Sequence, residues 1–216
     1  MMQSPVFIVE CPTCSQKYRY VREGYNTASE GKLWSDGYRE TELIPGIPLM
    51  ACCDECSDIF RVSPSEELLT SGIQGFESDY HATGMVNDDE IPVVRRLTAE
   101  EYAQLLVKRK YQNQEEERYL RMHLWWSINH HRRDGDKSDI SHYLKTILEE
   151  NLETLIYKTP PDNQENLLIL AELHRELGQF NEARQYLDKV NDDKYENIVS
   201  KLRDKIINRD KRVFPF

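Results

Sequence analysis

The sequence predicts an α+β fold in two parts, a small β unit followed by a larger helical domain. Two Cys-x-x-Cys pairs lie among short alternating segments in residues 1–64, whereas helical periodicity dominates residues 97–216. Residues 65–96 contain glycines and an excess of acidic side chains, which predicts a short helix and an acidic linker. The length of 216 residues suits one or two domains.

The cysteine pairs are Cys11-Pro-Thr-Cys14 and Cys53-Asp-Glu-Cys56. Two residues between the sulfurs let a tight turn direct both thiolates at one ion, and two such turns supply the four ligands that tetrahedral Zn²⁺ prefers. We therefore expect one structural zinc ion on Cys11, Cys14, Cys53 and Cys56. Four thiolates leave no position for a water molecule, so zinc hydrolysis is not expected there.

The fifth cysteine, Cys52, directly precedes the second pair and leaves two other interpretations open. One is a disulfide framework, and the other is a redox or labile-zinc switch that uses Cys52. The first ten residues have no basic segment of a signal peptide, and no apolar run approaches the length of a membrane span. We therefore expect a cytoplasmic protein without a membrane segment, in which cysteines serve as metal ligands.

Short strands are expected on both sides of each cysteine pair, at residues 6–9, 17–20, 49–51 and 59–62. So small a β unit buries too little apolar surface to fold alone, so the metal would contribute to its stability. Between the pairs, Trp34 precedes Ser35-Asp36-Gly37, which has turn chemistry. These residues could form an exposed recognition tip, but we favour a hairpin turn with Trp34 packed on the β unit.

Helices are expected over about residues 98–110, 114–133, 139–158, 163–177, 180–190 and 193–209. Thr98 and Glu101 form a capping box at the start of the first. In the second helix, Tyr119, His123, Trp126 and His130 share a face next to Trp125. That face could be an aromatic pocket or a second metal site, but we favour core packing against residues 139–158.

The net charge of −10 is the opposite of what a protein that coats nucleic acid would carry. Residues 95–133 form one basic region that could contact phosphate, although several of its cations lie at helix ends that favour them anyway. The sequence contains no phosphate-binding glycine loop, nucleophile elbow or dinucleotide fingerprint, so we do not expect an enzyme.

Residues 167–190 resemble a tetratricopeptide repeat, a pair of antiparallel helices in which small residues permit close approach. The matching residues are Leu167, Leu170, Ala171, His174, Gly178, Phe180, Ala183, Leu187 and Val190. His174 stands where that family usually has an aromatic residue, and no proline follows the repeat. The order of the whole chain is similar to uncharacterised bacterial proteins that join a four-cysteine zinc ribbon to a tetratricopeptide-like helical domain. Cys11–Cys14, residues 34–37, residues 45–48, Cys53–Cys56 and Trp125-Trp126 carry this similarity.

The resemblance implies a non-catalytic adaptor that binds a protein or peptide along the first helix of the repeat. The residues that match the binding side of that helix are Glu165, Leu168, Glu172, Arg175 and Glu176. Their acidic character suits a basic or mixed partner segment. The alternative is a nucleic-acid-associated regulatory protein built on the zinc ribbon. The sequence predicts neither the partner's identity nor the oligomeric state.

Overall fold

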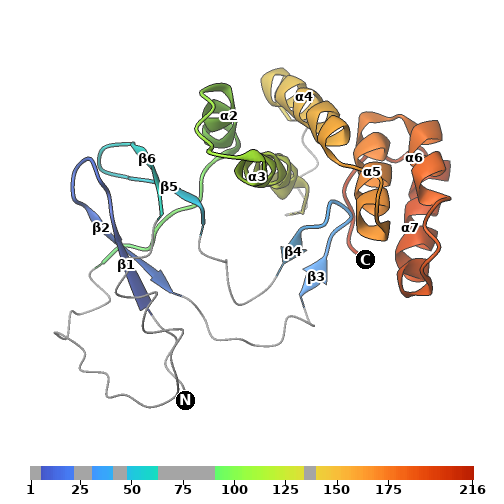
Figure 1. Ribbon diagram of the computed structural model, residues 1–216, viewed down its shortest axis with the longest axis horizontal. Coiled ribbons are helices and arrows are strands. Elements are labelled where there is room, and N and C mark those ends of the chain that lie inside the picture. The colour runs from blue at the N-terminus through green and yellow to red at the C-terminus, as the bar shows by residue number, and fades with distance from the viewer. Residues whose placement is uncertain (1–5, 22–30, 41–47, 63–90, 134–139) are drawn as a thin grey trace, which may run out of the picture. The chain divides into compact units, whose positions relative to one another are not determined.

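A computed structural model describes residues 6–21, 31–40, 48–62, 91–133 and 140–216. The chain forms two compact units, one of Met1–Glu30 with Thr41–Leu97 and one of Gly31–Glu40 with Thr98–Phe216. The first contains antiparallel hairpins and the second contains the helices, so the predicted α+β class is confirmed (Figure 1). The predicted helix after Ser63 lies outside the described residues.

Two antiparallel hairpins build the first unit, and each carries one cysteine pair in its turn. The alternation of apolar and polar residues places Val9 opposite Tyr18 in one hairpin and Ala51 opposite Phe60 in the other. The strands are β1 (Val6–Glu10), β2 (Lys17–Val21), β5 (Met50–Cys52) and β6 (Ile59–Arg61).

The segment of residues 91–97 joins the two hairpins. The N–H of Arg19 donates to the carbonyl of Pro92 at 2.8 Å, and the N–H of Val94 donates to Arg19 at 3.1 Å. Arg95 forms a bridge with Cys52 in β5. One extended segment therefore pairs with both hairpins.

The core of this unit is small and is built around the predicted ligands. It consists of Val9, Cys11, Tyr18, Ala51, Cys53, Phe60 and Val62, with Val94 packed against it. Two of these seven buried residues are cysteines of the predicted metal site, so the core and the site share residues.

The second unit is a succession of helices in which each packs on the next along the chain. Thr98 and Glu101 make the predicted capping box, with bonds of 3.3 and 2.8 Å. The first helix ends before the predicted Lys110, because Arg109 has a φ of +50° and leaves the helical conformation. The helices are α2 (Ala99–Val107), α3 (Gln114–Arg133), α4 (His142–Lys158), α5 (Gln164–Leu177), α6 (Phe180–Leu187) and α7 (Glu196–Ile207). Among the described residues, no helix is both long and apolar enough to cross a membrane.

The helices α5, α6 and α7 share a core with the C-terminal segment. This cluster contains Ala171, Ala183, Leu187, Leu202, Ile206 and Phe214. Ala171 and Ala183 are fully buried on neighbouring helices, as expected for small residues that let α5 and α6 approach closely. Gly178 ends α5 in the left-handed conformation, with φ +82°.

The short hairpin of β3 (Lys32–Leu33) and β4 (Arg39–Glu40) belongs to the helical unit, although its sequence lies between the two cysteine pairs. Its chain pairs with the C-terminal segment: the N–H of Ser35 donates to Phe214 and that of Phe216 to Leu33, both at 2.9 Å. The turn prediction is confirmed, since Gly37 has φ +79° and Trp34 is 5% exposed. The expectation that Trp34 packs on the β unit was wrong, because the groups that bond to this hairpin lie in the helical unit.

We predict that Phe214→Ala destabilises the helical unit by about 3 kcal/mol, because it empties a site in a packed core. Phe216→Ala is the matched control, since Phe216 is only half-buried and packs at the edge of the same cluster. Its effect should be about 1 kcal/mol. Urea unfolding followed by helical circular dichroism measures both, and equal effects would contradict the packing described here.

Candidate metal centre

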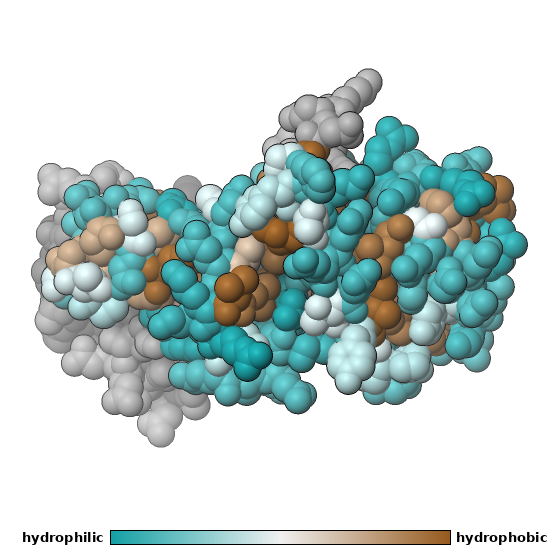
Figure 2. Space-filling view, turned by 90° about the horizontal axis from the view of Figure 1, so that it is seen from above, coloured by the Kyte–Doolittle hydropathy of each residue, from teal (hydrophilic) through white to brown (hydrophobic). Residues whose placement is uncertain are grey.

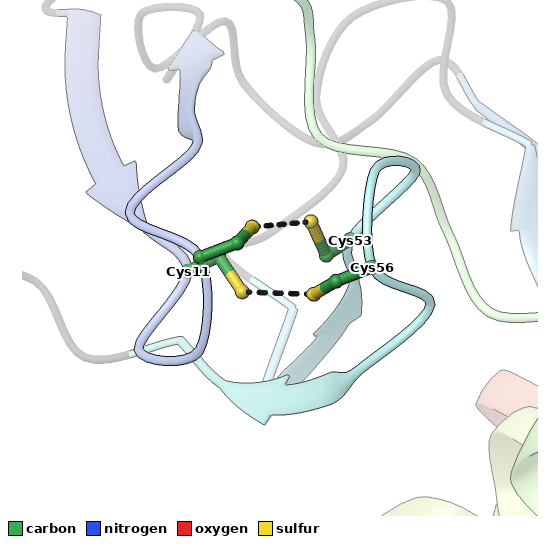
Figure 3. A group of neighbouring side chains, drawn as sticks. Cys11, Cys53 and Cys56 are labelled. Carbon is green, nitrogen blue, oxygen red and sulfur yellow. Dashed lines mark hydrogen bonds between the residues drawn. The ribbon is translucent and has the colours of Figure 1, made fainter.

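The sulfurs of Cys11, Cys14, Cys53 and Cys56 converge on one point. All four Sγ atoms lie within 4.8 Å of one another, in the only cluster of metal-ligating side chains found among the described residues. The Cys11–Cys56 and Cys14–Cys53 sulfur distances are 3.6 and 3.5 Å, and Figure 3 shows the sulfurs of the two turns facing each other. Four sulfurs about 2.3 Å from a tetrahedral ion would lie about 3.8 Å apart, so these four can hold one metal ion.

The two cysteine turns have the same backbone geometry despite different sequences. In the first turn, the N–H of Cys11 donates to Gln16 and that of Ser15 to Cys11; in the second, Cys53 and Ser57 make the equivalent bonds, all at 2.9 Å. Ser15 and Ser57 both adopt the left-handed conformation, at φ +61° and +58°. This position commonly holds glycine, so serine here strains the turns without altering how they direct the sulfurs.

A buried tyrosine connects the first hairpin to the second cysteine turn. The hydroxyl of Tyr18 donates to Cys53 Sγ at 3.2 Å and accepts from the N–H of Asp54 at 2.8 Å. Burial, together with the bond to Cys53, raises the pKa of Tyr18 to about 12, so the hydroxyl stays protonated as a donor. The sequence analysis missed this role, although a buried tyrosine opposite Val9 always needs a partner for its hydroxyl.

The thiols of Cys53 and Cys56 differ in how readily they ionise. Burial opposes ionisation of Cys53, but hydrogen bonds from Tyr18 and from the N–H groups of Cys56 and Glu55 lower its pKa to about 6. The N–H of Asp58 favours the thiolate of Cys56, yet burial and the neighbouring sulfurs raise its pKa to about 12. The thiolate is therefore favoured at Cys53 and opposed at Cys56, and a bound cation would favour ionisation of Cys56.

The fifth cysteine, Cys52, does not join the four converging sulfurs. It is 1% exposed, and its Sγ lies 3.6 Å from the carbonyl oxygen of Cys53. The sequence spacing therefore identified the converging pair correctly.

The residues predicted to line a peptide groove on α5 lie differently. Glu165 is exposed and Leu168 is half-buried, but Glu172, Arg175 and Glu176 are buried inside the unit. These three were wrongly predicted to face a partner. The C-terminal segment contacts this part of α5, because the Arg175 guanidinium carbon lies 5.4 Å from the centre of the Phe214 ring.

The aromatic residues of α3 pack within the unit. Trp125 is fully buried and donates to Glu176 of α5 at 3.1 Å. The rings of Tyr119, His123 and Trp126 follow one another at 4.0 and 5.0 Å. They contact Tyr102 of α2 and Tyr38 of the hairpin, while α3 also packs on α4 as predicted.

Comparison of this chain with protein-family models, with curated proteins and with solved structures found no match. The site is therefore interpreted from its own geometry.

We predict that Tyr18→Phe weakens metal binding by about 10- to 100-fold, because a hydrogen bond to a ligand orients it and stabilises its thiolate. A competition titration of Zn²⁺ against a coloured chelator measures the affinity. Tyr157→Phe removes a hydroxyl from an exposed ring in the helical unit and should leave the affinity unchanged. Equal affinities of the two variants would show that Tyr18 does not support the site.

Proposed function

We propose that this protein is a non-catalytic cytoplasmic adaptor, in which one structural Zn²⁺ stabilises the β unit and the helical unit binds another protein. A set of four thiolates supports a structural role, because it fills every position of a tetrahedral ion and leaves none for substrate. The small core around Cys11 and Cys53 supports it too, since so few buried residues make the metal part of the folding energy.

The outer face of α4 is the surface that carries the proposal. Tyr143, Glu150 and Tyr157 recur every seven residues and lie along one side of the helix, with Glu153 beside them. Tyr143 is 63% exposed and Tyr157 is 89% exposed, which is unusual for large aromatic side chains. Neither Glu150 nor Glu153 has an ion pair with the residues that the structure describes.

This face suits a basic segment of a partner protein. Lysine and arginine side chains place their charge against Glu150 and Glu153 and their methylene chains against the two tyrosines. In the view of Figure 2, hydrophilic residues cover most of the surface and hydrophobic ones form separate areas. Contacts of this kind depend on charge for selectivity and for the association rate.

We predict that Glu150→Lys with Glu153→Lys abolishes capture of the partner from lysate by the zinc-loaded protein. Glu182→Lys with Asp204→Lys is the control: it makes the same charge change at exposed positions of α6 and α7 and should leave capture intact. Capture is measured with nuclease present. Equal capture by both double variants would rule out the α4 face as the binding surface.

A second candidate function is association with nucleic acid, and one observation favours it. Lys108, Arg109 and Lys110 are consecutive exposed cations after α2, without an ion pair among the described residues. If these residues bind phosphate, capture would disappear with nuclease, fall steeply with salt and be lost in Lys108→Glu with Lys110→Glu. The same experiment therefore separates the two functions.

A further inference from the structure

Five charged side chains lie together inside the helical unit. Asp36 comes from the hairpin of residues 31–40, Arg133 from α3, and Glu172, Arg175 and Glu176 from α5. The side chains of Asp36, Glu172 and Arg175 are at most 1% exposed, that of Arg133 is 3% exposed, and Glu176 is 6% exposed. With every group ionised, three carboxylates face two guanidinium groups, which leaves one buried negative charge without compensation.

Pairing within the cluster identifies the carboxyl group that lacks a cation. Arg133 pairs with Asp36, while Arg175 binds both oxygens of Glu172, at 2.6 and 2.7 Å. Among the residues that the structure describes, Glu176 accepts hydrogen bonds only from neutral groups, Trp125 Nε1 at 3.1 Å and Asn129 Nδ2 at 3.3 Å.

Asn129 links the unpaired carboxyl group to the hairpin. Its Nδ2 donates both to Glu176 and to Asp36 Oδ2, the latter at 3.2 Å. Its Oδ1 is buried and has no partner within the described residues, so rotation of the amide would offer an acceptor to a protonated Glu176. Glu176 and Asp36 therefore share Asn129 Nδ2 as a hydrogen-bond donor.

Within the described part of the chain, no further cation forms an ion pair with a carboxylate of the cluster. Asp210, after α7, also contacts the cluster, because its carbonyl accepts from Arg175. Its carboxylate pairs instead with Lys205 and Arg212, at 3.0 and 3.1 Å. An uncompensated buried carboxylate is strongly disfavoured, and binding one proton removes the imbalance.

We propose that these five residues form a proton-dependent switch. Glu176 holds one proton at neutral pH, and loss of that proton loosens the hairpin of residues 31–40. The hairpin is the element that loosens, because its strands are two residues long and Asp36 is the carboxylate that it contributes to the cluster. Burial and repulsion from Glu172, partly offset by Arg175, raise the pKa of Glu176 to about 8, which sets the pH range.

All three tryptophans of the chain lie at this cluster and report on it. Trp34 is in the hairpin, Trp125 donates to Glu176, and Trp126 Nε1 donates to the carbonyl of Asp36 at 3.0 Å. Tryptophan emission of the intact, zinc-loaded protein is recorded between about pH 6 and 9. We expect a single-proton transition with its midpoint near the pKa of Glu176, about 8.

Two variants and a control decide the assignment. Glu176→Gln keeps a neutral group of the same shape and should abolish the transition, whereas Glu165→Gln, at an exposed position of the same helix, should not change it. Asp36→Asn removes one carboxylate, so the cluster is electrically neutral when Glu176 is ionised. The transition should therefore move to lower pH. A wild-type protein without the transition, or Glu176→Gln with it intact, would overturn the proposal.

The stability of the helical unit gives a second readout with a defined sign. The pKa of Glu176 is about 4.3 in an unfolded chain and is raised to about 8 in the folded protein. The contribution of Glu176 to stability is therefore fully present below about pH 4.3 and is lost as pH rises towards 8. The folding constant should fall by up to about tenfold per pH unit in this window. In Glu176→Gln this fall should be absent, and its persistence there would contradict the proposal.

Discussion

Convergence of four cysteine sulfurs is the constraint on which the first unit depends. Its two hairpins bury seven residues in their shared core, and two of those are the ligands Cys11 and Cys53. The surroundings favour the thiolate of Cys53 and oppose that of Cys56, so the contacts that bring these two sulfurs together do not ionise both. A divalent ion on the four sulfurs would resolve this conflict, because it would favour both thiolates and hold both turns at once. Tyr18 reinforces the arrangement from inside the core by bonding to Cys53 and to the backbone of Asp54.

Part of the chain between the two cysteine pairs does not belong to the β unit that contains those pairs. Residues 31–40 form a hairpin of the helical unit and pair with the C-terminal segment through Ser35 and Phe216. The chain therefore leaves the β unit, contributes to the helical unit and returns to complete the metal site. The ends of this stretch, Cys14 and Cys53, lie in the cluster of four sulfurs, and Asp36 in its middle makes buried contacts within the helical unit.

Local signals explain which features could be predicted. The spacing of Cys11, Cys14, Cys53 and Cys56 identified the converging sulfurs, and the capping box at Thr98 marked the start of α2, because both depend on residues close in sequence. The location of Trp34 and the burial of Glu172 and Glu176 depend on partners such as Arg133 and Phe214, which lie far away in the chain. A repeat pattern describes only the helices of the repeat itself, so it cannot show that a distant segment of the chain covers one of them. For this reason the predicted groove was wrong even though the helices themselves were placed correctly.

The most direct test of this account is amide hydrogen exchange of the intact protein, measured with zinc bound and again after chelation. We predict that residues 6–21 and 48–62 lose their protection without metal, because their core includes the ligands. Residues 31–40 should retain theirs together with the helices, because their hydrogen bonds are made within the helical unit. Loss of protection at residues 31–40 in step with the two cysteine turns would contradict the division of the chain described here, as would full protection of the turns after chelation.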